Sequence, residues 1–175
     1  MDGFLEGFKI GMDLLWSIIT ANPLLSTIII TFVVGSFLLS LIVQIIRKYR
    51  LKKSGITEVD KMSGRTFEEY LELLLRGRGY HAKLTPATGD YGADLVLTKS
   101  GKRIVVQAKR YKKNVGVKAV QEIASAKSYY NADECWVITN SFFTEQAKKL
   151  ARSNDVRLIN REELMNWMLQ EKKGA

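Results

Sequence analysis

The sequence predicts an α/β domain with a mixed central sheet flanked by helices, preceded by an N-terminal transmembrane helix. Three observations lead to this fold class. An apolar run occupies residues 23–46, two strand-like runs meet at the turn Ser100-Gly101, and strand and helix patterns alternate from there onward. The chain has 175 residues, which allows one domain of ordinary size beside a membrane segment.

Residues 23–46 are predicted to cross a membrane. The run contains no charged side chain and exceeds the roughly 20 apolar residues that a bilayer requires. A core helix or a cleaved signal peptide fits less well, because the chain begins acidic and the run leads directly into five Lys and Arg residues within 47–53. Because basic flanks stay on the cytoplasmic side, we expect a single-pass protein of the cell membrane, with its N-terminus outside and its C-terminal domain cytoplasmic.

The segments on either side of this span have their own patterns. Residues 1–22 contain an amphipathic stripe, which predicts a helix lying in the outer membrane interface and ending at Asn22-Pro23. A second span, which would place the N-terminus inside, is the alternative. Residues 47–60 are predicted to be a basic juxtamembrane linker with a hinge at Ser54-Gly55, so the folded domain would occupy residues 61–175.

The domain is predicted to contain four helices and five strands. Thr66-Phe67-Glu68-Glu69 resembles a capping box, which predicts that the first helix begins there and ends near Gly77. The alternation and turn patterns predict strands at 80–84, 93–99, 102–111, 134–139 and 156–159. Further helices are expected at 117–130, at 144–153 and, after the cap Asn160, up to residue 170.

The predicted hairpin brings polar side chains together. If Ser100 and Gly101 form the turn, Asp94 lies opposite Gln107 on one face, and Lys109 follows on that face. A carboxylate and an amide oxygen are hard ligands that suit Mg²⁺, and a nearby ammonium group helps to stabilise charge that develops on a phosphate. The alternative is that Asp94 only caps a turn and Lys109 is a solvated strand charge.

Charge and composition favour a polyanionic partner. Residues 1–46 carry a net charge of −2 and the whole chain +9, so residues 47–175 carry +11. One histidine and one cysteine exclude a disulfide scaffold and a metal site built only from His and Cys. The basic residues near the hairpin, which we expect to contact the phosphates of such a partner, are Lys102, Arg103, Arg110, Lys112, Lys113 and Lys118.

Several separated motifs occur in a characteristic order. They are Gly64 with Phe67-Glu68, Gly89-Asp90-x-Gly92-x-Asp94, Gln107-x-Lys109, Val120-Gln121-Glu122, and Thr139-Asn140-Ser141 with Phe143-Thr144. In these motifs the chain resembles the Mrr-type restriction endonuclease family, a branch of the PD-(D/E)XK nuclease superfamily. The resemblance covers about residues 62–169. It implies a restriction-endonuclease-like sheet and Mg²⁺-dependent hydrolysis of DNA phosphodiester bonds.

The resemblance also implies a role for each matching residue. Asp94 resembles the acidic metal ligand, and Gln107 stands where most of the superfamily has Asp or Glu. Lys109 resembles the catalytic lysine that orients or activates the attacking water, and the Ala108 carbonyl is a further candidate metal ligand. Glu68 resembles the helix carboxylate that completes the site. Supporting positions recurrent near the site are matched by Asp90 and Gln121.

Gln107 is the main departure from the wider superfamily. A neutral amide binds Mg²⁺ less strongly than a carboxylate does, so a second negative charge must come from Glu68, Asp90 or the DNA phosphate. We therefore expect a membrane-anchored DNA endonuclease in restriction or defence, and the resemblance allows a homodimer, since two strands need two sites. A membrane-tethered DNA-binding or scaffold module without cleavage, and a structure-selective repair nuclease, remain as alternatives.

Overall fold

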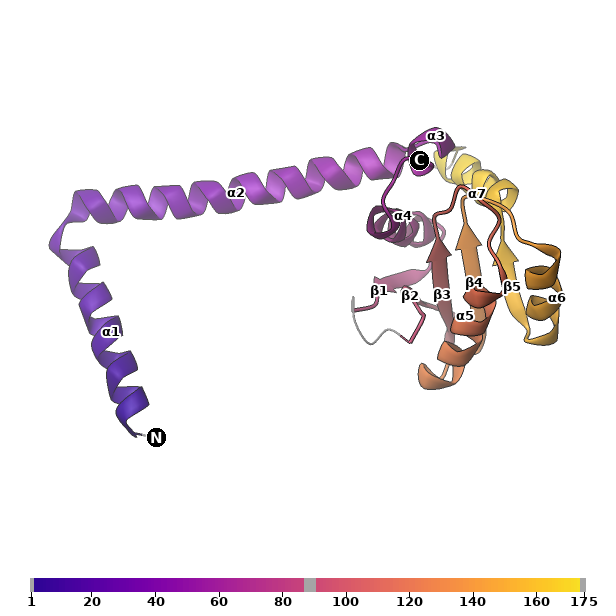
Figure 1. Cartoon of the computed structure of the whole chain (residues 1–175). Helices are drawn as coiled ribbons and strands as arrows, with labels where there is room; N and C mark the ends of the chain where they lie inside the picture. Colours follow the sequence, from indigo (N-terminus) through magenta and orange to yellow (C-terminus); the bar gives the residue numbers. More distant parts are fainter. Residues whose placement is uncertain (1, 87–90, 174–175) are drawn as a thin grey trace. The chain divides into compact units, whose positions relative to one another are not determined.

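The computed structural model describes residues 2–86 and 91–173 (Figure 1). The chain forms two compact units, Met1–Arg47 and Lys48–Ala175, each defined by the contacts among its own residues. Each unit is described by itself.

The N-terminal unit is helical. Helix α1 covers Asp2–Ala21, and α2 begins at Pro23 and continues to Lys53. Asn22 separates the two helices, and its side-chain oxygen accepts a hydrogen bond from the backbone N–H of Leu25 at 3.3 Å. The stretch Pro23–Arg47 is long and apolar enough to cross a membrane, and its most apolar part is not buried against other described residues of the chain. The first half of the predicted basic linker, residues 47–53, continues this helix, because Arg, Lys and Leu are good helix formers and the next glycine is Gly55.

The C-terminal unit is a five-stranded mixed sheet with helices on both faces (Figure 1), which confirms the predicted fold class. The sheet order is β1-β2-β3-β4-β5; the pairs β1–β2 and β2–β3 are antiparallel, and β3–β4 and β4–β5 are parallel. The strands are His81–Leu84, Leu95–Lys99, Lys102–Lys109, Glu134–Thr139 and Val156–Ile159. The helices α3 to α7 are Ile56–Val59, Gly64–Gly77, Val117–Tyr129, Glu145–Ser153 and Arg161–Lys173.

Each face of the sheet has its own apolar core, as alternation along the strands requires. On one face, Leu95 and Val106 pack with residues of α4 and α7. On the other face, Val105 and Val137 pack with residues of α5 and α6. The central strands β3 and β4 are therefore covered on both sides, and polar side chains near their ends are held by a rigid frame.

The start of the domain differs from the prediction in two respects. Val59 of α3 is fully buried in the core, so the packed domain begins before Lys61 rather than at it. The helix α4 begins at Gly64, and its N-cap is Ser63, whose hydroxyl accepts the backbone N–H of Thr66 at 3.1 Å. The predicted capping box at Thr66 is wrong. Ser63 caps the first turn instead, so the helix begins two residues before Thr66.

Candidate active site

The hairpin register places Asp94 opposite Gln107, as the sequence predicts. Strands β2 and β3 pair Leu95 with Val106 and Lys99 with Lys102, and the turn is Ser100-Gly101. One residue before β2, the N–H of Asp94 donates to the carbonyl of Val106 at 2.8 Å. The Asp94 carboxylate Oδ2 in turn accepts the N–H of Ala108 at 2.7 Å. The carboxylate is thus fixed to β3 between Gln107 and Lys109.

Asp94 has a strongly perturbed carboxyl group. Burial raises the pKa of Asp94 to about 6, and the negative charge of Glu68 adds to this rise. The N–H of Ala108, the positive charge of Lys109 and a hydrogen bond from Gln107 act in the opposite direction. The structure therefore brings together Asp94, Gln107, Ala108, Lys109 and Glu68.

Gln107 is the most deeply buried polar residue of this group. Only 3% of the residue is exposed, yet its Oε1 atom has no hydrogen-bond partner in the described part of the chain. A buried carbonyl-type oxygen without a partner costs free energy unless a cation or a water molecule binds it. Beside the Asp94 carboxylate, this oxygen suits a hard cation such as Mg²⁺.

The sequence offered Glu68 and Asp90 as sources of the second negative charge at the metal site. Glu68, on α4, pairs with Arg65 at 2.9 Å and remains near enough to act on Asp94. Asp90 lies outside the described residues. Within residues 2–86 and 91–173, no group of three His, Cys, Asp or Glu side chains is arranged to hold a metal ion. The described residues thus offer a site with one directly placed carboxylate.

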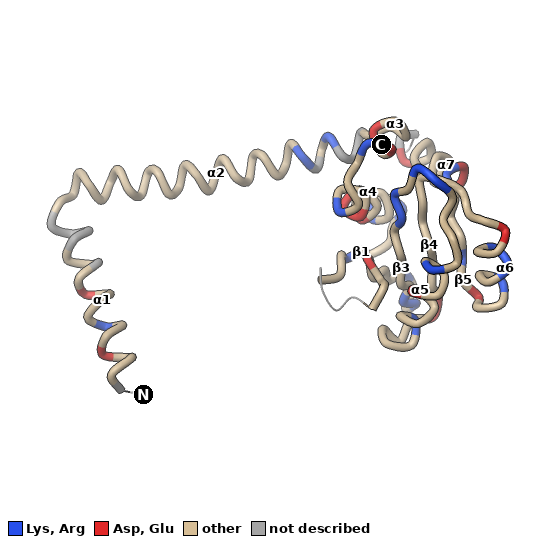
Figure 2. Tube along the Cα trace, viewed as in Figure 1, with Lys and Arg blue, Asp and Glu red and all other residues tan. Residues whose placement is uncertain are grey.

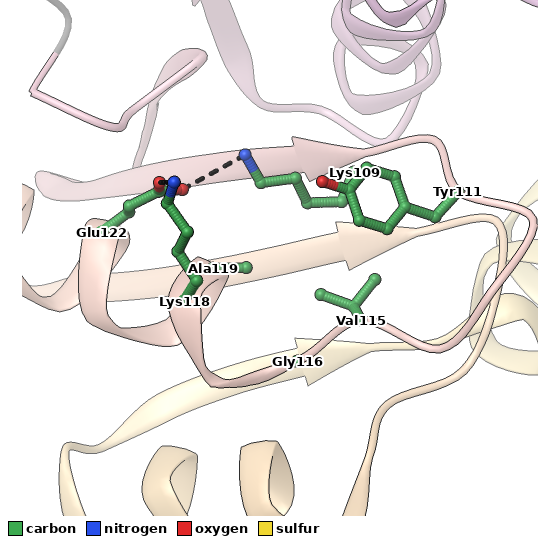
Figure 3. A pocket seen from close by; sticks show the side chains of 7 residues that line it. All are labelled: Lys109, Tyr111, Val115, Gly116, Lys118, Ala119 and Glu122. Carbon is green, nitrogen blue, oxygen red and sulfur yellow. Dashed lines mark ion pairs between the residues drawn. The ribbon is translucent and has the colours of Figure 1, made fainter.

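Lys109 has a partner that the sequence did not suggest. Its Nζ lies 3.2 Å from Oε2 of Glu122 on α5, and both side chains are largely buried, with 23% and 30% exposed. Figure 3 shows this ion pair at one end of a small pocket, which is lined by Lys109, Tyr111, Val115, Gly116, Lys118, Ala119 and Glu122. Gln121, the predicted supporting residue, is exposed and does not line the pocket. Only the packing of α5 on the sheet selects Glu122 over its neighbour.

A polar network holds the backbone at the carboxyl ends of β3 and β4. The Thr139 hydroxyl donates to the carbonyl of Lys109 at 2.6 Å, and Asn140 Oδ1 accepts the N–H of Tyr111 at 2.8 Å. Asn140 Nδ2 donates to Asp60 at 2.7 Å, and Arg161 donates to both oxygens of Asp60. The Arg161 guanidinium holds the pKa of Asp60 below its ordinary value. Thr139-Asn140 was recognised as a motif in the sequence, but the sequence did not show that these residues hold the end of β3, where Lys109 lies.

The six predicted DNA-binding residues do not form one cluster. Lys102 and Arg103 lie at the hairpin turn, seven and six residues from Lys109 along β3, which is roughly 20–23 Å at about 3.3 Å per residue. Lys102 pairs with Glu134 at 3.5 Å, and the Arg103 guanidinium donates to the carbonyl of Tyr130. The other four residues, Arg110, Lys112, Lys113 and Lys118, lie in the loop after β3 or at the start of α5, next to the site (Figure 2).

Comparison with known proteins agrees with this architecture. A family model described as restriction endonuclease, the Mrr catalytic domain, matches residues 59–168. The crystal structure of AF1548, a protein of unknown function, aligns with a TM-score of 0.52 and 20% identity over 61% of this chain and 65% of that chain. The DNA modification-dependent restriction endonuclease AspBHI gives the same TM-score and identity over 74% of this chain and 36% of its own.

These structural matches show the fold alone at such identity, and the chain spans less than two thirds of either matched protein. The search of curated proteins gives no match to this chain. The family model, in contrast, covers well over half of the chain and nearly all of the C-terminal unit. The chain therefore belongs to the Mrr-type restriction endonuclease family.

Proposed function

We propose that this protein is a membrane-anchored, Mg²⁺-dependent DNA endonuclease. The observation that carries the proposal is the buried Oε1 of Gln107, which has no hydrogen-bond partner among the described residues and lies beside the Asp94 carboxylate, with Lys109 two residues further along the same strand. A buried polar oxygen without a described partner, beside a carboxylate, fits a cation site better than a purely structural position. The family supports DNA as the substrate.

In this proposal Asp94, Gln107 and the Ala108 carbonyl would hold Mg²⁺, which when bound would offset negative charge on the scissile phosphate. Lys109 donates hydrogen bonds that orient the attacking water and stabilises the phosphate charge in the transition state. The water oxygen bonds to phosphorus as one ester bond breaks. The water loses a proton, and the leaving oxygen gains one. Glu68 contributes negative charge from α4.

The charge beside the site fits a DNA backbone. Lys112, Lys113 and Lys118 are exposed at the same end of β3 as Lys109, whereas Arg110 is half-buried. Contacts of this kind add affinity that does not depend on sequence and that falls as salt rises. Nothing in the described domain resembles a module that reads bases in a groove, so the proposal includes no sequence preference.

The apolar stretch of α2 suggests where the enzyme acts. Pro23–Arg47 would place the domain at the cytoplasmic face of the membrane, and the basic residues that follow support that orientation. A nuclease held there cleaves DNA close to the membrane, so incoming foreign DNA is the proposed target and defence the proposed role. A homodimer would supply two sites for two strands.

Incubation of the full chain, solubilised in detergent, with supercoiled plasmid and Mg²⁺ tests the enzymatic proposal. We expect nicked and linear products from the parent and none from Asp94→Ala or Lys109→Ala. Glu145→Gln is the control, because this exposed residue of α6 pairs with Lys148 on its own helix. It should cut as the parent does.

DNA binding that weakens with salt, without cleavage by the parent in Mg²⁺ or Mn²⁺ on plain or methylated plasmid, would contradict the endonuclease proposal. That result would favour the alternative of a tethered DNA-binding module. Cleavage that survives in Asp94→Ala would instead reject the assigned site while keeping the activity.

A further inference from the structure

We infer that Glu122 is a positioning residue that holds the Lys109 ammonium group at the place where the reaction needs it. The inference rests on the proposed function and adds a residue to its site. Lysine has a flexible four-carbon side chain and a single point charge, so its direction must be fixed by a neighbour. Glu122 Oε2, at 3.2 Å from Lys109 Nζ, is placed to do this (Figure 3).

The position of Glu122 is itself fixed by the loop that leads to Asp94. Gly92 approaches α5 so closely that a Cβ built on it would lie 2.9 Å from the Cβ of Glu122 and 3.2 Å from its backbone carbonyl. One residue earlier, Tyr91 stacks on Tyr129 of α5, with 3.9 Å between the ring centroids. The segment before Asp94 and the helix α5 are therefore packed together at two places, at Glu122 and at Tyr129.

Lys109 is fixed from the other side by its backbone. Its carbonyl accepts the Thr139 hydroxyl, and β3 pairs with β4 as far as Lys109 and Thr139. With the backbone held by Thr139 and the ammonium by Glu122, both ends of the flexible side chain are defined. Lys118, one helical turn before Glu122, approaches the other oxygen, Oε1, at 3.8 Å. It leaves Oε2 to Lys109.

Partial burial separates this pair from an ordinary surface ion pair. Exposed pairs contribute little because water screens them and their side chains move. The Lys148–Glu145 pair on α6 has 44% and 73% of its side chains exposed, against 23% and 30% for Lys109 and Glu122. Glu145→Gln is therefore the matched control: the same chemical change, on a helix, in a pair with lysine, away from the site.

The test compares Glu122→Gln with Glu145→Gln in the full chain, solubilised in detergent. Gln keeps the size of the side chain, so the packing against Gly92 is preserved. For Glu122→Gln we expect kcat for plasmid nicking to fall about tenfold or more, because misplaced catalytic groups lose rate steeply. KM for DNA should stay within about twofold of the parent value, since no contact to DNA is removed.

A spectrum of lysine side-chain ¹⁵N nuclei supplies a readout that does not require activity. The Lys109 ammonium signal, assigned by its absence in Lys109→Arg, should be protected in the parent and lost or shifted in Glu122→Gln. It should be unchanged in Glu145→Gln.

Three results would overturn the inference alone: a kcat of Glu122→Gln equal to that of the control, a loss confined to KM, or an unchanged Lys109 signal in Glu122→Gln. A parent protein that cuts no DNA overturns the proposed function and this role together. The two failures are therefore distinguished by whether the parent cuts.

Discussion

At the scale of single residues, Asp94 shows how a functional group works against stability. Burial raises its pKa to about 6 from an ordinary value of 3.8, so the folded protein holds the charged form less well than the unfolded chain does. A carboxyl group with a raised pKa stabilises the fold only while it is protonated, and that contribution is lost as pH rises through about 6. At pH 8 the charge costs on the order of 3 kcal/mol in the metal-free protein.

Asp94→Asn should therefore stabilise the metal-free protein while it abolishes cleavage. Asn keeps an oxygen that accepts the Ala108 N–H but carries no charge. We expect the free energy of unfolding at pH 8, measured by urea titration with chelator and tryptophan fluorescence, to rise by about 1–3 kcal/mol. At pH 4 the difference should be small, because the parent carboxyl is then protonated. A variant less stable than the parent at pH 8 would show that burial of this charge is not the dominant effect.

Gly92 tests the close contact between the Asp94 loop and α5. Its φ is +89° and a Cβ would meet Glu122, whereas a Cβ on Gly101, with φ +80°, would have none of the described atoms beyond its chain neighbours within 4 Å. Gly101→Ala should cost about 1 kcal/mol, the effect of the left-handed backbone alone. Gly92→Ala should cost about 2–3 kcal/mol in urea unfolding, because steric overlap is added. Equal losses in the two variants would contradict the close packing.

At the scale of elements, one side chain that follows the end of β4 holds the loop after β3. Asn140, which is 3% exposed, connects the N–H of Tyr111 to Asp60. Asn140→Ala leaves the N–H of Tyr111 without its acceptor and removes one of the donors to Asp60, which keeps Arg161, and we expect a loss of about 2–3 kcal/mol in urea unfolding. Asn114→Ala, in the same loop but exposed, should change stability by less than about 0.5 kcal/mol. Comparable losses from the two would mean that the network does not support the loop.

The elements also explain which parts of the site could be predicted from sequence. A two-residue turn fixes the register of a hairpin, so the placement of Asp94 opposite Gln107 follows from local rules. The length of β3 could likewise have separated Lys102 from Lys109, since strand residues advance by a fixed distance. The Glu122–Lys109 pair depends on how α5 packs on the sheet, and the Asp60–Arg161 pair joins residues 101 positions apart. No local pattern encodes such contacts.

At the scale of the whole molecule, the split in charge and hydropathy coincides with a split in structure. The described apolar side chains between Leu24 and Ile46 are almost all exposed, whereas the core of the domain is closed on both faces of the sheet. Exposed apolar surface of this extent fits the proposal that α2 crosses a membrane. In that proposal a bilayer would cover the helix, whose backbone hydrogen bonds are satisfied internally.

The orientation of this helix gives the last prediction. In inverted membrane vesicles, protease should digest the domain and leave a small protected fragment that contains residues 23–46; in right-side-out vesicles the domain should resist. Val34→Lys combined with Leu38→Lys should prevent stable insertion, because each charge near the centre of a span costs about 2.5–3.5 kcal/mol. Val34→Leu with Leu38→Val is the matched control and should insert normally. Digestion of the domain only in right-side-out vesicles would reverse the orientation and remove the domain from cytoplasmic DNA.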